Sequence, residues 1–344
     1  MKRLRILVLL HEEFLPPDDI RGLSDQEIHP WKAEYDVLRT LEELGHEVRP
    51  LPLGDELAPI RFYAQEWKPH VIFNLLRDFH GIGIYDAHII SLLELLRLPY
   101  TGCNPRGLLL ATDKALSKKI LGWHRIPVPA FAFFRRGQAV RPRKKLPWPM
   151  IVKSAVEHAS LGITQASIVH DPEGLIERVH YVHERIGTDA IAEEYIEGRE
   201  LTVGILGNLR LQAFPVWELT FQKLPPGSAP IVTERVKSDL DYQEKLGVRS
   251  RRARDLEPAL EEQARRIARR AFRALSMSGY GRVDMRLGAD GRLRVLEANP
   301  NPDLCFGEDL AESAEAAGLP YPALIQRILN LGLRYSPPWK AQGS

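Results

Sequence analysis

In the N-terminal part of the chain, largely apolar runs alternate with segments whose apolar residues have helical spacing. Residues 4–10 (LRILVLL) and 70–76 (HVIFNLL) are typical of strands that are covered on both faces. Residues 31–44 place apolar side chains at helical spacing, and Gly45 follows where a helix C-cap is expected. A further strand is expected near 47–51, and helices near 57–67 and 84–97. This order predicts parallel strands joined by right-handed crossovers in an open, doubly wound sheet.

The pattern after Pro99 mixes shorter extended segments with helices. Helices are expected at 107–121 and 172–186, and strands at 129–134, 149–153, 163–169 and 190–196. Strands at 200–206 and 210–219, a polar stretch at 220–254, a basic helix at 256–276, a hairpin at 281–298, a loop and a helix near 321–332 follow. The sequence therefore predicts an α/β protein with an N-terminal doubly wound parallel sheet (1–106), a small central α+β domain (107–197), a C-terminal α+β domain (198–335) and a tail (336–344).

Composition narrows the class of protein. The chain has 344 residues, and its net charge of +2 argues against a protein that holds nucleic acid through its phosphates. Basic runs such as Arg141–Lys145 are therefore interpreted as solvated. Two cysteines are too few for a disulfide framework. The apolar run Ile6–Leu10 is shorter than a signal peptide requires and ends at His11, so we expect a cytoplasmic protein without a membrane partner.

The strongest chemical signal is a hairpin near the C-terminus. Asp290-Gly291 between extended segments predicts a two-residue turn. That turn places Asp284 opposite Glu297 and Arg282 opposite Asn299, all on one face of the hairpin. The residues expected on the other face, as core, are Val283, Met285, Leu287, Leu296 and Ala298.

Two facing carboxylates repel each other, so they need a proton, a salt bridge or a cation. Asp284, Glu297 and the amide oxygen of Asn299 form a donor set that suits Mg²⁺. Two ions bridged by Glu297, with Mn²⁺ as a substitute, would suit phosphoryl transfer. The alternative is an ordinary surface hairpin in which Arg282 and Arg286 pair with the acids, because a register slip of one residue would exchange the faces.

These residues resemble the ATP-grasp superfamily, and within it the D-alanine–D-alanine ligase branch. Gly281-Arg282-Val283-Asp284 and Glu297-Ala298-Asn299 match the family hairpin in sequence and spacing. The resemblance extends over nearly the whole chain. Its other matches are His80-Gly81, Leu98-Pro99-Tyr100-Thr101-Gly102, Thr112-Asp113-Lys114, Ile151-Val152-Lys153 and Glu193 with Glu200-Leu201-Thr202. It implies the three-domain ATP-grasp fold and ATP with Mg²⁺ as cofactors.

The resemblance also implies roles for individual residues. Lys114 and Lys153 would contact the phosphates or adenine of ATP, and Glu200 would bind the ribose hydroxyls. The adenine edge would be read by the backbone of Glu193, Glu194, Tyr195 and Ile196. As catalytic residues, Lys237 would reach the γ-phosphate, Arg282 would stabilise the acyl phosphate and the tetrahedral intermediate, and His80 would lie beside the first substrate. A core histidine is the alternative for His80.

The function implied is an ATP-dependent carboxylate–amine ligase that acts through an acyl phosphate on a small carboxylic acid and a small amine. Residues 154–162 and 220–245 are candidate lids that would exclude water. A nucleotide-binding module of the same fold without ligase turnover is the alternative. The resemblance alone suggests a homodimer.

The residues at the substrate end depart from the family pattern. By ungapped counting, Ala159 replaces a serine of the family's hydrogen-bonded triad, His158 the glycine before it, and Ser238 the tyrosine. Asp303 stands at the glycine that donates its N–H to the oxyanion, and Glu308 at the serine that holds the carboxylate of the second D-alanine. We therefore expect a D-alanine–D-alanine ligase-like enzyme whose product is not D-alanyl-D-alanine.

Overall fold

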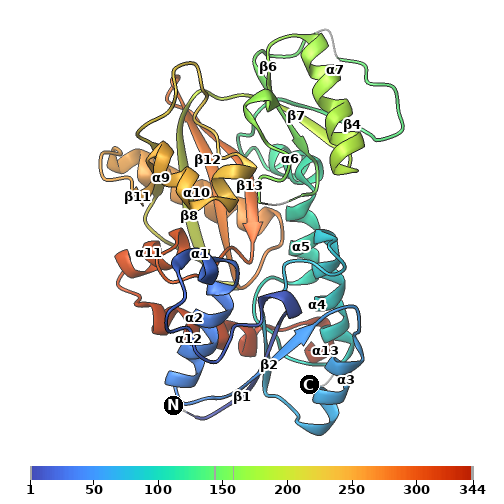
Figure 1. Ribbon diagram of the computed structural model, residues 1–344, viewed down its shortest axis with the longest axis vertical. Helices are drawn as coiled ribbons and strands as arrows, with labels where there is room; N and C mark the ends of the chain where they lie inside the picture. Colours follow the sequence, from blue (N-terminus) through green and yellow to red (C-terminus); the bar gives the residue numbers. More distant parts are fainter. Residues whose placement is uncertain (1, 143–144, 158, 342–344) are drawn as a thin grey trace.

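Three sheets organise the part of the chain that the structure, a computed structural model, describes: residues 2–142, 145–157 and 159–341 (Figure 1). His158, two residues of the basic run at 141–145 and the last three residues of the predicted tail lie outside the described residues. Figure 1 shows the first sheet in the lower part of the molecule and the other two sheets in the upper part. Among the described residues, no helix is both long enough and apolar enough to cross a membrane.

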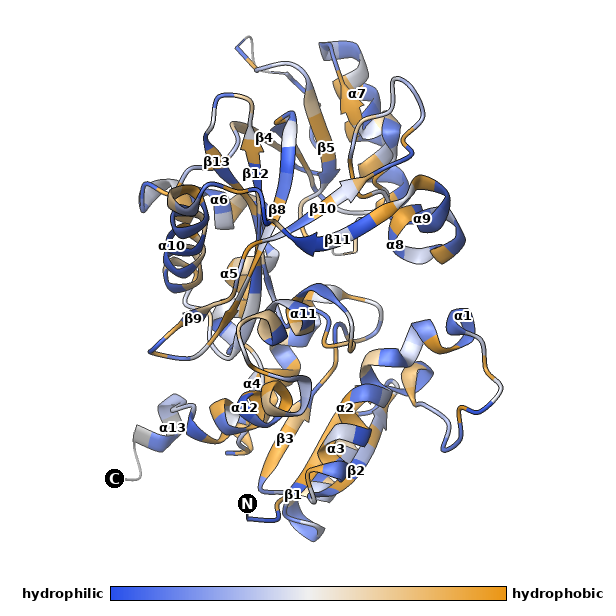
Figure 2. Ribbon diagram, turned by 90° about the vertical axis from the view of Figure 1, so that its left-hand side faces the viewer, coloured by the Kyte–Doolittle hydropathy of each residue, from blue (hydrophilic) through white to orange (hydrophobic). Residues whose placement is uncertain are grey.

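The first sheet is parallel throughout, in the order β2-β1-β3. Its strands are β1 (Arg5–His11), β2 (Glu47–Leu53) and β3 (Val71–Asn74), and its nearby helices are α1 (Asp25–Ile28), α2 (Lys32–Glu43), α3 (Ala58–Glu66) and α4 (Asp86–Leu95). β1 and β3 are buried along nearly their whole length, as their apolar runs predict, and β3 is orange in Figure 2. α2 covers one face of the sheet, and α3 and α4 cover the other. The doubly wound sheet is therefore confirmed.

The last long helix, α12 (Tyr321–Arg334), returns to this first sheet. Its buried Leu324 and Ile328 belong to the same core cluster as Ile6 and Val8 of β1. Figure 1 shows α12 beside α2, and a short helix, α13 (Pro338–Ala341), follows it. One face of the N-terminal sheet is thus covered by residues from the other end of the chain. The domain boundaries themselves stay a prediction.

The central part of the chain forms an antiparallel sheet in the order β4-β7-β5-β6. Its elements are α5 (Pro105–Thr112), α6 (Lys114–Trp123), β4 (Phe131–Phe134), β5 (Met150–Ser154), β6 (Ile168–Val169), α7 (Pro172–Tyr181), which continues as a π-helical turn (Val182–Ile186), and β7 (Ala190–Glu194). The single helix expected at 107–121 is wrong, because Asp113 leaves the helical conformation and its carboxylate caps α6 at the N–H of Leu116.

The strand expected at 163–169 is also largely wrong. Gln165–Ser167 form a 3₁₀ turn, and only Ile168 and Val169 pair as a strand. The cause is local hydrogen bonding: the Ser167 hydroxyl accepts the N–H of Thr164, and hydroxyl side chains offer the backbone such alternatives to a strand.

The C-terminal sheet has the order β11-β10-β8-β12-β13, with β9 paired to β8. Its strands are β8 (Gly198–Leu206), β9 (Gln212–Ala213), β10 (Trp217–Phe221), β11 (Val248–Arg252), β12 (Tyr280–Gly288) and β13 (Leu293–Pro300), and its helices are α8 (Glu234–Ser238), α9 (Leu240–Leu246), α10 (Pro258–Ala274) and α11 (Asp309–Ala316). The polar stretch at 220–254 therefore contains two helices and an edge strand, and the loop expected after the hairpin contains α11.

The hairpin β12–β13 keeps the predicted pairs but not the predicted turn. Asp284 faces Glu297, and Arg282 faces Asn299. Beyond Asp284 the register shifts by one residue at a bulge, so the loop is a three-residue turn in which Gly291 has a φ of +71°. The two-residue turn is therefore wrong. The bulge also brings Leu296, which was expected in the core, to the cleft described below.

Candidate active site

A cleft of about 850 Å³, its open mouth included, lies between the central and C-terminal sheets. The predicted site residues that line it are Lys114, Lys153, Glu193, Glu194, Tyr195, Ile196, Glu200, Asp284 and Glu297. Apolar side chains also line it, from Ile151, Leu161, Ile163, Ile231, Val232 and Leu296. A largely apolar cleft with a few convergent charged groups is the usual form of a ligand site.

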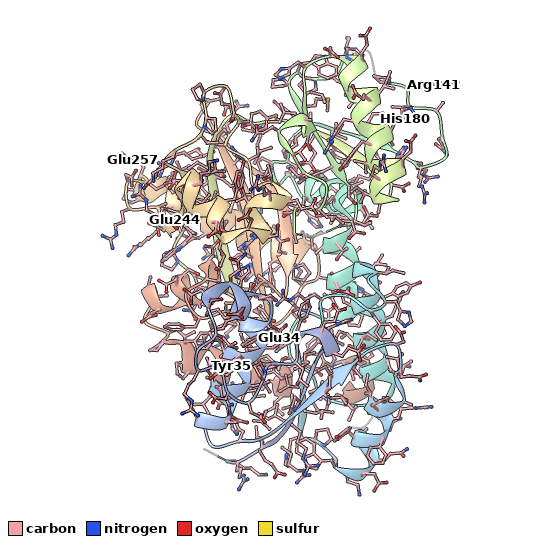
Figure 3. The ribbon with its side chains drawn as sticks, viewed as in Figure 1. Glu34, Tyr35, Arg141, His180, Glu244 and Glu257 are labelled. Atoms are coloured by element: carbon pink, nitrogen blue, oxygen red, sulfur yellow. The ribbon has the colours of Figure 1, made fainter. Side chains whose placement is uncertain are left out.

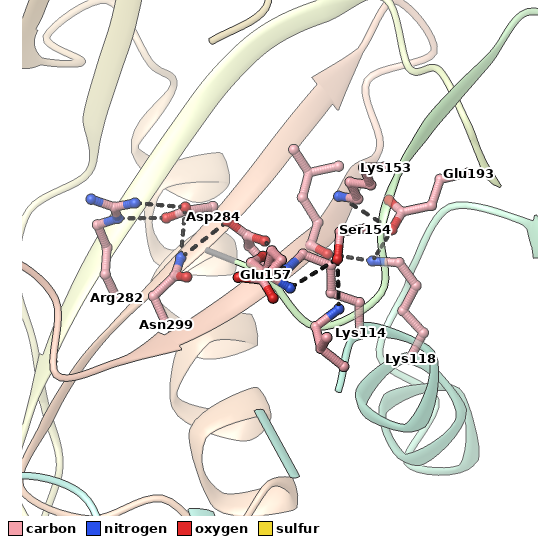
Figure 4. A network of polar contacts seen from close by, with 12 residues as sticks. Lys114, Lys118, Lys153, Ser154, Glu157, Glu193, Arg282, Asp284 and Asn299 are labelled. Atoms are coloured by element: carbon pink, nitrogen blue, oxygen red, sulfur yellow. Dashed lines mark hydrogen bonds and ion pairs between the residues drawn. The ribbon is translucent and has the colours of Figure 1, made fainter. Parts of the chain in front are cut away.

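Glu193 on β7 is the centre of a buried charge network (Figure 4). Its Oε1 lies 3.2 Å from Nζ of Lys118 and 3.2 Å from Nζ of Lys153. Lys153 reaches it because β5 and β7 are paired, with Ile191 opposite Lys153 and Glu193 two residues further on. Burial tends to lower the pKa of Lys153, but the carboxylates of Glu193 and Glu297 raise it above its ordinary value. Lys153, which lines the cleft, therefore offers positive charge there, and Lys118 supports the network from behind it.

Lys114 begins α6 and joins this network to the hairpin. Its Nζ donates to the backbone carbonyl of Glu157 at 2.6 Å and lies 3.7 Å from Oε2 of Glu297. Burial lowers the pKa of Lys114, and the charge of Lys153 lowers it further, while Glu297 opposes both. An anionic ligand would offset the repulsion between these two lysines.

Lys118 is a residue of the network that the sequence reasoning missed. Its side chain is 2% exposed, and its Nζ also donates to the backbone carbonyl of Leu296, the bulge residue of β13. Burial lowers the pKa of Lys118 to about 8. The available signal was its spacing, because a lysine four residues after Lys114 lies on the same face of a helix.

Glu200 and Arg286 form a second ion pair, directly opposite each other on β8 and β12, in which Arg286 is buried and Glu200 is partly exposed. Nη2 of Arg286 donates to Oε2 of Glu200 at 2.8 Å and to the carbonyl of Pro230 at 2.7 Å. Burial raises the pKa of Glu200, although Arg286 opposes that shift. Arg286 also lies over the ring of Tyr195, 5.7 Å from its centre. Arg286 therefore organises the adjacent wall of the cleft and does not pair with the acids of the hairpin.

The facing carboxylates are held by cationic and amide donors. Nε and Nη2 of Arg282 donate to Asp284 at 2.7 and 2.8 Å, and Nδ2 of Asn299 donates to Asp284 at 2.8 Å. Burial tends to lower the pKa of Arg282, but Asp284 raises it well above its ordinary value. The alternative of an arginine pairing with the acids is thus partly observed. Asp284 is only 7% exposed, so the hairpin is not an ordinary surface hairpin.

The donor set fits a hard divalent cation. In the part of the chain that the structure describes, no three His, Cys, Asp or Glu side chains gather as a metal site, so the candidate ligands are two carboxylates and one amide. Mg²⁺ commonly takes only one or two protein carboxylates and completes its shell with water and phosphate oxygens. Asp284 and Glu297 would hold it, and rotation of the Asn299 amide would exchange its nitrogen for its oxygen.

The three predicted catalytic residues, Arg282, Lys237 and His80, all lie outside the lining of the cleft, although Arg282 adjoins it through its hydrogen bonds to Asp284. His80, with a φ of +56°, is on a loop where its Nε2 is 3.5 Å from Asp55. Its side chain is 43% exposed, so the core alternative is wrong. Lys237 on α8 is exposed, but its charge contributes to lowering the pKa of Asp303. The charge of Lys237 therefore acts on the acidic residues that follow the hairpin.

That acidic end follows the hairpin. Partial desolvation and the carboxylates of Asp309 and Asp303 raise the pKa of Glu308, while Lys237 and Arg282 oppose the shift. Nη1 of Arg282 lies 3.9 Å from Asp309. Carboxylates thus gather beside Arg282 at the positions where the sequence departs from the family pattern.

The two candidate lid segments contact each other over the cleft. The N–H of Gly162 donates to Glu234 at 2.8 Å. Gln165, three residues beyond the first segment, exchanges two side-chain hydrogen bonds with the backbone of Ala229 at 2.9 and 3.1 Å. Leu161 and Ile231 line the cleft from the two segments. These contacts link the two segments beside the cleft, where a water-excluding cover would lie.

Comparisons with known proteins agree with this geometry. A family described as "D-ala D-ala ligase C-terminus" matches residues 121–330. A D-alanine–D-alanine ligase of Desulfotalea psychrophila is 33% identical over 282 residues, 77% of this chain and 78% of that protein. An uncharacterized protein of Sinorhizobium fredii, y4sG, is 32% identical over 314 residues, 89% of each chain. The crystal structure of D-alanine–D-alanine ligase from Bacillus anthracis, complexed with ATP, superposes with a TM-score of 0.75 at 23% identity, covering 99% of this chain and 100% of that one.

The fold is therefore the ATP-grasp fold. The matched family extends over more than half of the chain, and the relatives cover most of it. The chain belongs to the D-alanine–D-alanine ligase family, whose members are ATP-dependent ligases that form carbon–nitrogen bonds. The predicted family, fold and enzyme class are confirmed.

Proposed function

We propose that this protein is an ATP-dependent carboxylate–amine ligase that acts through an acyl phosphate and whose product is not D-alanyl-D-alanine. The observation that carries the proposal is the single cleft in which Lys114, Lys153 and Glu193 meet the facing carboxylates Asp284 and Glu297. The lysines suit the phosphates of a nucleoside triphosphate, and the carboxylates suit the cation that accompanies it.

The nucleotide would lie along this cleft. The adenine would rest among the apolar side chains near Tyr195 and Ile196, with the ribose toward Glu200. Lys114 and Lys153 would bind the phosphates, since both lysines line the cleft with largely buried side chains. The complex of the Bacillus anthracis enzyme with ATP supports ATP as the nucleotide.

The proposed reaction begins when a carboxylate oxygen of the acid attacks the γ-phosphorus of ATP and ADP departs. Lys114 and Lys153 would offset the charge of the phosphates, and Lys237 would reach toward the γ-phosphate. Bound Mg²⁺, in one or two ions, would neutralise the phosphate oxygens. The amine nitrogen then attacks the acyl carbon, phosphate leaves, and the nitrogen loses a proton. Arg282 would stabilise the negative charge on the tetrahedral intermediate.

The acidic end of the site argues against D-alanine as the amine. A free α-carboxylate beside Asp303, Glu308 and Asp309 costs energy unless a proton or a cation intervenes. We therefore expect an amine substrate with a neutral or cationic group at this end. Cytoplasmic location and a homodimer remain predictions.

Release of ADP tests the proposal. The protein is incubated with ATP, Mg²⁺ and paired acids and amines, and D-alanine is compared with D-alaninamide as the amine. We expect ADP release that needs both an acid and an amine, with the amide preferred. ATP binding without turnover for any pair would favour the nucleotide-binding module. A preference for free D-alanine that Glu308→Ser does not alter would contradict the assignment of the acidic end.

A further inference from the structure

A second, smaller cavity of about 290 Å³, its opening included, lies where the first sheet meets the segment after the hairpin. Its polar lining comes from Glu34 on α2, Asn74 at the end of β3, Arg77 after β3, Tyr280 at the start of β12, and Asn301 and Asp303 after β13. Ligands of open α/β sheets bind outside the carboxyl ends of the strands, which is where Asn74 and Arg77 stand. Figure 3 shows Glu34 near the middle of the molecule, away from His180 and Arg141 at the upper end.

Glu34 carries an unmatched buried acceptor in this cavity. Its side chain is 1% exposed, and its Oε1 accepts a hydrogen bond from Nη2 of Arg77 at 3.2 Å. Its Oε2 is buried and has no hydrogen-bond partner among the residues that the structure describes. Burial raises the pKa of Glu34, and the charge of Asp303 contributes to the same shift. A buried carboxylate oxygen without a donor is costly, so a donor from a ligand would stabilise it.

Among the residues that line the cavity, two carboxylates, Glu34 and Asp303, accompany one guanidinium, Arg77. Arg77 is the counter-ion of Glu34, and its charge also lowers the pKa of Asp303 against the effect of desolvation. Arg77 thus acts on both carboxylates, and the exposed Lys237 also acts on Asp303. A monovalent cation with N–H donors would both balance this charge and supply Oε2 of Glu34 with a hydrogen bond.

The walls of the cavity are held in place independently of a ligand. Nζ of Lys32 donates to the carbonyl of Phe306 at 2.7 Å, and Asp36 accepts the N–H of Phe306 at 2.8 Å, so α2 is tied to the segment after the hairpin. Asn301 is fixed through its Oδ1, which accepts the N–H of Cys103 at 2.8 Å. A rigid cavity costs little ordering when a ligand binds.

The cavity is lined by the residues that directly follow the hairpin. Asn301 is two residues beyond Asn299 of the hairpin, and Asp303 is electrostatically coupled both to Arg77 and to Lys237. The reacting carboxylate of the acid substrate needs the cations of the cleft. The carboxylates of Glu34, Asp303 and Glu308 suit the positively charged amine substrate instead.

We propose that this cavity is a subsite for a non-reacting ammonium group of the amine substrate, so that the enzyme acts on diamines or on amines of similar double charge. This inference rests on the proposed function. Glu34 would accept the hydrogen bond of the ammonium group, and Asp303 would add a second negative charge. The reacting amine of the same molecule would then lie toward Arg282.

Binding and turnover test the subsite separately. With ATP and Mg²⁺ present, 1,3-diaminopropane is compared with propylamine, first by the ligand-induced rise in Tm and then by ADP release with a fixed acid. We expect the wild type to prefer the diamine about tenfold or more. Glu34→Gln should lose this preference, whereas Glu43→Gln, an exposed glutamate on the same helix, should keep it. Arg77→Gln should strengthen diamine binding, because it leaves two acids without their counter-ion.

Glu34→Gln should weaken diamine binding, whereas Arg77→Gln should strengthen it. If the ion pair had only a structural role, its loss would weaken diamine binding in both variants alike. No diamine preference in the wild type, or an equal preference in wild type and Glu34→Gln, would overturn the inference. An advantage of 3-aminopropionate over propionate as the acid, without any diamine preference, would place the ammonium on the other substrate and would also overturn it. Because the rise in Tm needs no turnover, failure of the ligase proposal would be seen independently.

Discussion

Lys118 and Glu193 form an ion pair that is closed to solvent, with 3.2 Å between Nζ and Oε1 and side chains that are 2% and 1% exposed. The same Nζ also donates a hydrogen bond to the carbonyl of Leu296, next to Glu297. One lysine therefore connects the central sheet, where a nucleotide is proposed to bind, to the bulge that brings Glu297 opposite Asp284.

Replacing this lysine should weaken both stability and nucleotide binding. Lys118→Met leaves Glu193 with Lys153 as its remaining cation and the Leu296 carbonyl without its donor. Removal of one partner of a buried pair costs about 3–5 kcal/mol, and the retained Lys153 should bring the loss to the lower part of that range. Urea unfolding measures the stability, and ADP-release kinetics should show a raised KM for ATP.

The control for this prediction is Lys119→Met, because Lys119 is the next residue on α6 and is exposed. It should change the free energy of unfolding by less than about 0.5 kcal/mol. Equal stability of Lys118→Met and Lys119→Met would show that the buried pair does not hold the bulge.

Asp284→Asn and Glu297→Gln should each abolish Mg²⁺-dependent ATP turnover while the fold is retained. From the sequence alone, relief of the carboxylate repulsion is expected to make the metal-free variants slightly more stable. The structure reverses this expectation for Asp284, because Arg282 makes two charge-assisted hydrogen bonds to it. We therefore expect Asp284→Asn to be less stable than Glu297→Gln without metal, in thermal unfolding with EDTA. Turnover retained in either variant would exclude that residue as a metal ligand.

Glu200→Gln should raise the KM for ATP with a smaller effect on kcat. The substitution removes the charge that Arg286 pairs with at 2.8 Å and that the ribose hydroxyls are proposed to meet. A charged hydrogen-bond partner contributes about 1.5–3 kcal/mol, so a rise in KM of about tenfold or more is expected. Glu197→Gln, three residues away and exposed, should leave the KM unchanged. Competition with adenosine, which carries the ribose without phosphates, should be weakened in parallel.

The hairpin part of the candidate site could be predicted from sequence, because the strand periodicity and the family motif agree there. The pairing of Asp284 with Glu297 followed from the spacing of the hairpin, yet the turn from which it was counted is wrong. The three-residue loop and the bulge at Leu296 compensate each other, so the pair survives. Periodicity cannot reveal a bulge, since the extra residue is seen only in the strand pairing.

Contacts between distant segments could not be predicted in this way. Lys118 has the pattern of an ordinary helix lysine, and its burial comes from β7 and β13, which lie far along the chain. Likewise, the spacing of apolar residues in α12 predicts a helix with one apolar face. It does not predict that this face packs on β1. Helices α8 and α9 were missed because their few buried residues, Val236 and Leu246, leave little pattern in a polar stretch.

Asp86 should make the stability of the protein depend on pH in the acid range. It lies in the first turn of α4 with 8% of its surface exposed, and burial raises its pKa to about 7 from 3.8. Because the folded state then holds its proton to higher pH than the unfolded state, the free energy of unfolding falls as the pH rises from about 4 to about 7. Asp86→Asn keeps the shape without this titration and should therefore become more stable than the wild type by up to about 4 kcal/mol above pH 7, with little difference below pH 4.

Urea unfolding between pH 4 and 8 measures the difference, and Asp25→Asn, which replaces an exposed aspartate in the first turn of α1, should show no such trend. A difference between Asp86→Asn and wild type that is constant over this range would show that Asp86 is ionised in the folded protein throughout.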